Sequence, residues 1–201
     1  LYAVSFPLIA QKLQIDSVTN DISYEEVVHA DSLPAVDILR LAKKWAVVGF
    51  GAGKDMIDYY DENEKMMIIK PIFKLSGFLE MPAWPSKIKV FTNYTVNHRL
   101  EIETKDGRYR IFSHGFIITK RMSTTGLPDM ELPAQNILFA EEKNLKIGAA
   151  TAYPNNTKKQ EEMIETMKAE KKMLQDQFDI QIREEFSSLK EYIRKRPKKY
   201  W

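Results

Sequence analysis

The chain has 201 residues, 44% of them hydrophobic, and it contains no cysteine, which excludes disulfides, thiolate metal sites and cysteine nucleophiles. Its 30 Lys and Arg residues against 28 Asp and Glu give a formal net charge of +2, so no global field draws it onto nucleic acid or anionic lipid. No apolar run reaches the roughly 18 to 20 residues that span a bilayer. We therefore expect a soluble, globular protein.

Residues 22–30 predict a strand, because aromatic and β-branched residues alternate there with charged ones. A helix follows, with a side-chain cap expected at residues 31–32 and Pro34 in the first turn. Its apolar face consists of four side chains at helical spacing: Ile38, Leu41, Trp45 and Val48. The helix is predicted to pack Trp45 on a sheet and to stop at a group of glycines that begins with Gly49.

Two β-hairpins are predicted next. Residues 56–60 and 65–75 flank a polar segment of hairpin-loop length. Residues 87–104 alternate apolar and polar side chains over a length that requires a bulge or a bend. Asp106–Gly107 forms a tight turn, because glycine accepts the positive φ that such turns need, and residues 108–119 return as the partner strand.

The C-terminal third is predicted to be an irregular excursion followed by one long helix. Residues 120–155 contain three prolines and little periodicity, with at most a short strand or helical turn near 137–139. Residues 156–194 have apolar side chains spaced mostly by three, four or seven. Such a helix is about 60 Å long, roughly twice the width of a compact domain of about 150 residues.

We therefore expect residues 163–178 to dock on the domain and the next part of the helix to contact a partner or a second copy. The predicted contact residues form an apolar stripe: Ile182, Phe186, Leu189 and Ile193. The alternative is a helix that bends within residues 175–182 and folds back on itself. The predicted organisation is an α+β domain of residues 1–155, followed by residues 156–201 as a long amphipathic helix with a basic tail.

A pattern of short segments runs through residues 6–119: FPL at 6–8, ISYEEVV at 22–28, AKKW at 42–45, DMIDY at 55–59, MIIK at 67–70 and LEIETKDGRYR at 100–110. In this pattern the chain resembles a bacterial domain of unknown function with a TATA-binding-protein-like (TBP-like) fold, found in exported proteins of Gram-negative anaerobes. The resemblance implies β-α-β-β-β-β-α order, a curved antiparallel sheet and a long C-terminal helix.

The resemblance also implies secretion to the periplasm or cell envelope, and Leu1-Tyr2-Ala3 is compatible with the end of a removed signal peptide. The excursion at 120–155 is longer than the family pattern. The family supplies no established catalytic residues, so the resemblance leaves function open.

No catalytic, cofactor or metal site is predicted. The glycine-rich run at 49–54 lacks phosphate-loop spacing, and the acidic segment at 58–64 lacks calcium-loop spacing. His29, His98 and His114 share no metal-ligand spacing. His98 and His114 are expected to face each other across the hairpin, as a polar cross-strand pair or, alternatively, as a proton-transfer pair.

The C-terminal tail concentrates positive charge and aromatic side chains: Arg194, Lys195, Arg196, Lys198, Lys199 and Trp201. A solvated helix end is the favoured interpretation, and contact with a membrane surface is the main alternative. No nucleic acid partner is expected, because the DNA-facing groove of the TATA-binding protein needs a duplicated saddle and this chain has a single unit.

Two functional hypotheses follow. The first is a non-enzymatic protein-binding or scaffolding module of the cell envelope that contacts a partner through its sheet face or its long helix. The second is a small apolar-ligand-binding protein or cryptic enzyme with a pocket between the sheet and the helix. A filled sheet–helix interface favours the first hypothesis, and an enclosed cavity with convergent polar groups favours the second.

Overall fold

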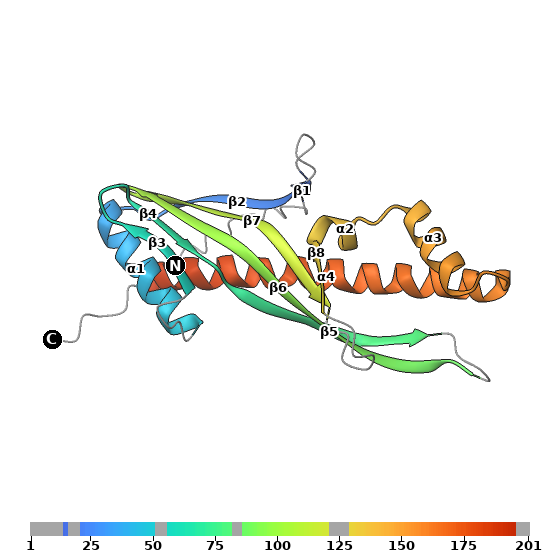
Figure 1. Ribbon diagram of the computed structural model, residues 1–201. Coiled ribbons are helices and arrows are strands. Elements are labelled where there is room, and N and C mark those ends of the chain that lie inside the picture. Colours follow the sequence, from blue (N-terminus) through green and yellow to red (C-terminus); the bar gives the residue numbers. More distant parts are fainter. Residues whose placement is uncertain (1–13, 16–20, 51–55, 82–85, 121–128, 196–201) are drawn as a thin grey trace, which may run out of the picture.

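The computed structural model describes residues 14–15, 21–50, 56–81, 86–120 and 129–195 (Figure 1). The strands in these ranges are β1 (Gln14–Ile15), β2 (Ile22–His29), β3 (Ile57–Asp61), β4 (Met66–Ile69), β5 (Ile72–Met81), β6 (Ile88–Lys105), β7 (Arg108–Lys120) and β8 (Met130–Pro133). The helices are α1 (Ala35–Gly49), α2 (Ala134–Leu138), α3 (Glu142–Ala152) and α4 (Thr157–Lys195). The predicted α+β class, with an antiparallel sheet and a long C-terminal helix, is confirmed.

The sheet is built around β6, which has 18 residues. Its strand order is β1-β2-β7-β6-β4-β3, and all pairs are antiparallel. Along one edge of β6, β4 pairs with one end and β5 with the other, while β7 occupies the opposite edge. The predicted strand at 65–75 is thus two strands, because Lys70 and Pro71 interrupt it. The bulge predicted within residues 87–104 lies on the partner strand instead: between the pairs Asn97–Ile117 and Arg99–His114, β7 has two residues opposite one of β6, and Gly115 there has a φ of 65°.

The turn between β6 and β7 also holds the start of α1. Gly107 has a φ of 75°, as the predicted tight turn requires, and Lys105 pairs with Arg108 across it. The side chain that caps α1 comes from this turn, because Oδ1 of Asp106 accepts a hydrogen bond from the backbone N–H of Ala35 at 2.8 Å. The cap predicted at residues 31–32 is wrong: the residue before the helix is Pro34, and no local side chain caps it.

Helix α1 buries Trp45 as predicted, but the stripe of buried residues along the helix differs from the predicted one. Its buried stripe runs through Ala35, Ile38, Leu39, Ala42, Trp45 and Ala46. Val48, which was predicted to be in the core, is 71% exposed. Trp45 also reaches α4, since its Nε1 donates a hydrogen bond to Oγ of Ser188 at 3.0 Å.

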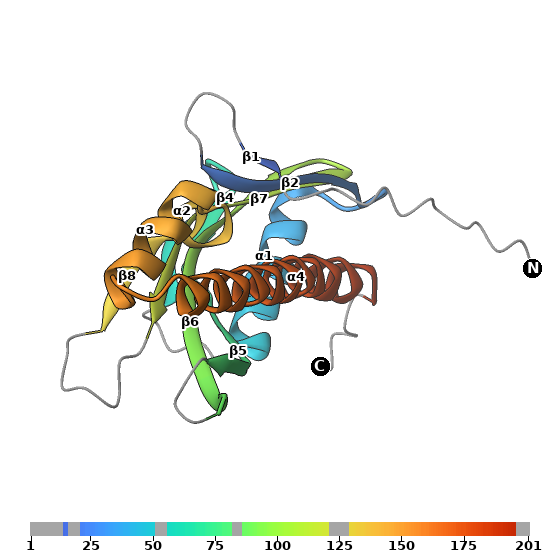
Figure 2. The ribbon, with the colours of Figure 1, turned by 90° about the vertical axis from the view of Figure 1, so that its right-hand side faces the viewer.

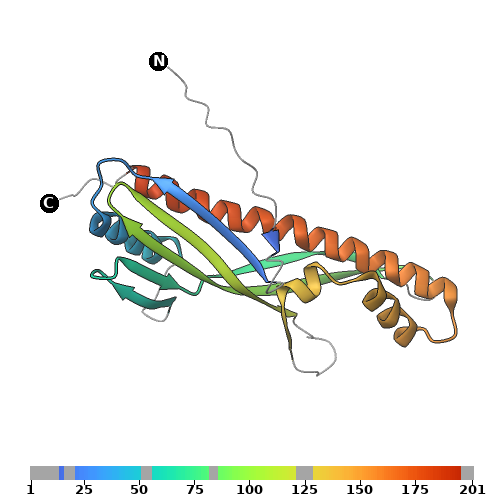
Figure 3. The same ribbon diagram turned by 90° about the horizontal axis from the view of Figure 1, so that it is seen from above.

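The sheet curves around α4, which lies in its concave side (Figure 2) and follows its length (Figure 3). Helix α4 is one continuous element of 39 residues, so the bend that was considered as the alternative is absent. Its buried side chains are Leu174, Phe178, Ile182, Phe186, Leu189 and Ile193, and they join one cluster with the inner side chains of the sheet and α1. The prediction that Ile182, Phe186, Leu189 and Ile193 contact a partner is therefore wrong.

The reason for this error is the length of the sheet. The 18 residues of β6 extend about 60 Å at 3.3 Å per residue. The 39 residues of α4 extend about 58 Å at 1.5 Å per residue. Because the sheet is elongated, it accommodates the helix, and the C-terminal half of α4 is its most deeply buried part.

The N-terminal half of α4 is covered by part of the segment 120–155, which was predicted to be irregular. That segment contains β8, α2 and α3, and α2 includes part of the predicted turn at 137–139. Ala149 of α3 is buried, and Gly148 allows Met167 of α4 to approach closely. On the other side, Gly77 of β5 makes room for Met173.

At the end of α4, Arg194 and Lys195 are exposed. The rest of the predicted tail (Arg196, Lys198, Lys199 and Trp201) lies outside the described residues. No helix in the described ranges is both long enough and apolar enough to cross a membrane.

Candidate functional site

The two faces of the sheet differ in what covers them. Side chains that alternate along β6 and β7 point either toward α4, which we call the inner face, or away from it, the outer face. The inner-face side chains are buried with those of α1, α2 and α4 in a single cluster. The outer-face side chains of β7 are exposed or half-buried. The outer face is therefore the sheet surface that these helices leave open.

Three outer-face side chains of β7 form a stacked row. The guanidinium carbon of Arg110 lies 4.9 Å from the centroid of the Phe112 ring. The Phe112 ring in turn stacks on His114, with 4.7 Å between centroids and 22° between planes. Cation–π and ring-stacking contacts of this kind fix the orientation of side chains that are in contact with water. We call Arg110, Phe112 and His114 the β7 row.

Carboxylates on the neighbouring strands hold the β7 row in place. Arg110 pairs with Glu25 of β2 at 2.9 Å and with Glu103 of β6 at 3.1 Å. Nε2 of His114 lies 3.0 Å from Oε1 of Glu101, which also accepts a hydrogen bond from Arg99 at 3.1 Å. The outer face thus presents a pre-ordered aromatic and charged surface, the composition that recurs in the anchoring positions of protein interfaces.

The two histidines that were predicted to face each other lie on opposite faces of the sheet. His114 pairs with Arg99, because Lys105 pairs with Arg108 across the two-residue turn and this register places His114 opposite the residue after His98. Alternation along β6 then points His98 to the inner face. There Nε2 of His98 lies 3.1 Å from Oε2 of Glu185 on α4, and the His98 ring stacks on Phe116 at 5.0 Å. The predicted pairing was wrong by one residue, because the turn is centred between Asp106 and Gly107 and not on Asp106.

His98, Glu185 and Ser113 are a histidine, a carboxylate and a hydroxyl on the same side of the sheet. Each has one buried atom with no hydrogen-bond partner among the described residues: Nδ1, Oε1 and Oγ, respectively. The side chains of His98 and Glu185 are 0% and 8% exposed, and Ser113 is fully buried. Nucleophilic catalysis needs contact between these groups and a substrate, and their burial is incompatible with that in this conformation.

A second buried polar cluster lies where α4 leaves the body of the sheet. Oε1 of Glu170 accepts hydrogen bonds from the hydroxyl of Tyr94 and, at 3.1 Å, from Nζ of Lys120. Burial raises the pKa of Glu170 to about 7, and burial lowers the pKa of Lys120. Farther along the helix, Tyr24 donates a hydrogen bond to Asp179 at 3.2 Å. These contacts fix the position of α4 on the inner face.

The other motifs have structural partners. In the acidic segment, Asp61 accepts hydrogen bonds from the backbone of Asn63 and Glu64, and Glu62 binds Arg40 at 2.9 Å. Within the described ranges, no three potential metal-ligating side chains gather in one place. Of the glycine-rich run, Gly49 ends α1, and residues 51–55 lie outside the described part.

Comparison with solved structures identifies the fold. A TBP-like protein from Parabacteroides distasonis ATCC 8503 superposes with a TM-score of 0.56 at 12% sequence identity, covering 87% of this chain and 93% of that one. The chain has a TBP-like fold. A DUF4468 family protein from Bacteroides ovatus ATCC 8483 gives a TM-score of 0.42 at 12% identity, covering 62% of this chain and 66% of that one.

No family model matches the sequence, and no curated protein matches it. The TBP-like fold confirms the fold that the resemblance implied. Structural similarity at this identity gives the fold and no activity, so function has to be argued from the surfaces of this chain.

The sequence contained a usable signal for the β7 row. Arg110, Phe112 and His114 alternate in a strand that was correctly predicted, so they had to share one face. Which face stays open depends on where α4 packs, and the sequence pattern alone does not determine that.

Proposed function

We propose that this TBP-like protein is a non-enzymatic binding or scaffolding module that contacts a protein partner through the outer face of its sheet. The observation that carries the proposal is the β7 row of Arg110, Phe112 and His114, pre-ordered on the open face. Arginine and aromatic side chains dominate the energetics of protein interfaces, and pre-ordering lowers the entropy cost of binding.

The packing of the inner face supports the same proposal. Large side chains such as Tyr94, Phe178 and Leu100 are buried there with 0 to 2% exposure, as members of one apolar cluster. Such packing favours a module over the rival hypothesis of a ligand pocket between the sheet and α4. The unpartnered atoms of His98, Glu185 and Ser113 are the feature that favours the rival, and all three atoms are buried away from solvent.

The proposed location is the periplasm or cell envelope. This part rests on the sequence resemblance to exported proteins. Fractionation of the native cells tests it directly: recovery with periplasmic or envelope markers supports export, and recovery with cytoplasmic markers contradicts it.

Affinity capture from the same cells tests the partner. The double variant Arg110→Ser/Phe112→Ser removes the stack from the outer face, and Lys172→Ser/Ile180→Ser makes a matched change on exposed positions of α4. A protein retained by the wild type and the α4 variant, but lost from the outer-face variant, supports the proposal. Equal retention by both variants would overturn it.

A further inference from the structure

The sheet continues beyond β7 as a two-stranded ribbon. The last pair between β6 and β7 is Tyr94 with Lys120, whereas β5 continues to pair with β6 as far as Met81 with Ile88. We call residues 76–81 and 88–93 the distal ribbon. It extends along the N-terminal half of α4, past the end of β7 (Figure 1).

Two phenylalanines stand on the outer face of the distal ribbon. Phe78 and Phe91 are direct cross-strand partners, with ring centroids 5.0 Å apart. They are 69% and 53% exposed. Their neighbours Gly77 and Leu79 face α4, Gly77 against Met173 and Leu79 buried, so alternation along β5 points Phe78 away from the helix. The pair is an apolar projection on the surface.

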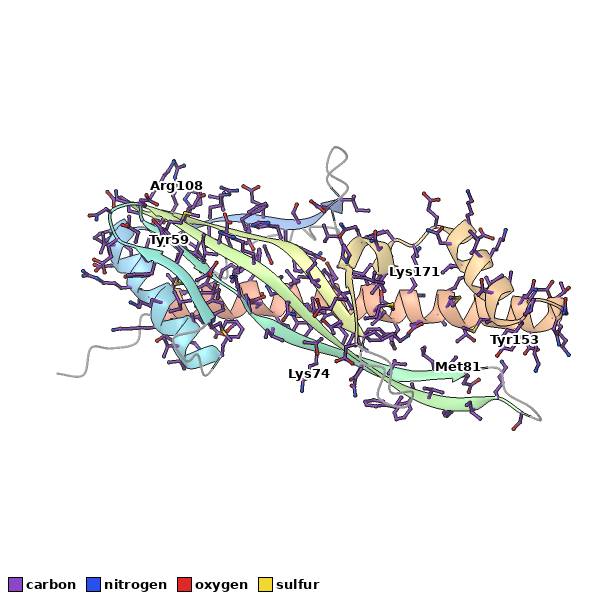
Figure 4. All side chains as sticks on the ribbon, viewed as in Figure 1. Tyr59, Lys74, Met81, Arg108, Tyr153 and Lys171 are labelled. Atoms are coloured by element: carbon purple, nitrogen blue, oxygen red, sulfur yellow. The ribbon has the colours of Figure 1, made fainter. Side chains whose placement is uncertain are left out.

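Lysines lie on and beside the ribbon. Lys89 is the cross-strand partner of Glu80, and Lys74 and Lys87 are exposed just outside the ribbon, so these four exposed side chains carry a formal charge of +2. Lys74 extends from β5 away from α4 (Figure 4). Lysine ammonium groups beside exposed phenylalanine rings match the chemistry of an anionic lipid surface, with phosphates in front of an apolar layer.

Helix α4 supports the ribbon from behind. Oγ1 of Thr166 donates a hydrogen bond to the backbone oxygen of Glu80 at 2.9 Å. The Gln177 side chain binds both the backbone N–H and the backbone oxygen of Ser76, at 3.1 and 2.9 Å. Because α4 packs behind these two strands, the phenylalanine pair is already positioned in the free protein. No folding is needed when the pair contacts the surface.

We propose that the distal ribbon docks on an anionic lipid surface, with Phe78 and Phe91 inserted at the boundary between headgroups and acyl chains. The lysines beside them then contact headgroup phosphates. A second copy of this chain fits this surface less well. The area that two side chains on a narrow ribbon can bury is far below the roughly 1,200 Å² of accessible surface that a stable interface buries. The lipid contact does not depend on the protein partner proposed above.

Co-sedimentation with vesicles tests the proposal on the full chain. The probes are vesicles of phosphatidylcholine alone and of phosphatidylcholine mixed with phosphatidylglycerol, at low salt. We expect the wild type to bind the mixed vesicles. The double variant Phe78→Thr/Phe91→Thr should bind about tenfold more weakly or worse. Lys87→Gln/Lys89→Gln should lower the affinity about fivefold per lysine, and only for the anionic vesicles.

Two controls keep the outcome unambiguous. Val27→Thr changes an exposed apolar side chain on β2, outside the ribbon, and should bind like the wild type. Arg194→Gln/Lys195→Gln weakens the basic end of α4 and should also bind like the wild type. No binding by the wild type, equal binding by the phenylalanine variant, or loss only in the Arg194 and Lys195 variant would each overturn the proposal. So would a stable dimer that the phenylalanine variant abolishes.

Discussion

Nε2 of His98 lies 3.1 Å from Oε2 of Glu185, and this pair joins the middle of β6 to α4 inside the core. Both side chains are buried away from solvent, and the Phe73 and Phe116 rings pack against the histidine ring. A buried pair of this kind is costly to break but is not necessarily stabilising compared with apolar side chains of similar size.

Replacing one member of the pair should therefore be worse than replacing both. Glu185→Leu leaves His98 buried without its partner and should lower the free energy of unfolding by about 3 to 5 kcal/mol. His98→Leu/Glu185→Leu should be less destabilised than Glu185→Leu alone, because no polar group is then left unpaired. Urea unfolding measures both variants. A double variant less stable than the single one would show that the pair stabilises the fold.

Stability should depend on pH through Glu170. Burial raises its pKa in the folded chain to about 7, above its ordinary value of 4.5, so the folded state binds this proton more tightly than the unfolded state does. The contribution of Glu170 is therefore present below pH 4.5 and is lost as the pH rises through 7. The predicted loss of unfolding free energy is at most about 3 kcal/mol.

Glu170→Gln should remove this dependence, because glutamine stays neutral and still accepts the hydrogen bonds of Tyr94 and Lys120. We expect the variant to gain stability relative to the wild type at pH 8 and to lose most of that gain at pH 5. Glu165→Gln, an exposed position on the same helix, is the matched control. If the free energies of unfolding of the wild type and Glu170→Gln change in the same way between pH 5 and pH 8, the prediction is contradicted.

Trp45 connects α1 to α4 and to the sheet. Trp45→Ala should cost about 3 to 5 kcal/mol of unfolding free energy, through a cavity and the loss of the hydrogen bond to Ser188. Val48→Ala on the exposed side of the same helix should change stability by no more than about 0.5 kcal/mol. Thermal unfolding of the two variants checks the assignment of the buried face, and equal effects would refute it.

The Asp106–Gly107 turn should contribute to stability in two separable ways. Asp106→Ala removes the cap of α1 and should cost about 1 kcal/mol. Gly107→Ala places a side chain at a φ of 75° and should cost about 1 kcal/mol or more. Asp106→Asn retains an acceptor oxygen and should recover most of the capping energy. An alanine variant as stable as the asparagine variant would show that the cap contributes nothing.

Much of the fold followed from local sequence rules. The hairpin at Asp106–Gly107, the helix around Trp45 and the long C-terminal helix were predicted because each depends on residues close together in the chain. The errors concern long-range packing. Val48 lies on the helical stripe at spacings of three and four, but the sheet meets α1 on the side of Ala42 and Ala46.

The same limit explains the partner prediction for Ile182 and Ile193. Their spacing correctly marked an apolar face, but the expected width of the domain came from a compact shape. The pairing of β5 with the far end of β6 lengthens the sheet, and no local pattern shows that pairing. The β7 row was readable as one face of a strand, whereas its openness depends on the placement of α4.

The most direct test of the account compares the two faces of the sheet in one capture experiment from the native cells. Arg110→Ser/Phe112→Ser alters the outer face, and His98→Leu/Glu185→Leu removes the polar groups between the sheet and α4. Function on the outer face predicts that the first variant loses the partner retained by the wild type, while the second keeps it. Loss of the partner, or of a bound small molecule, only in the second variant would contradict the account.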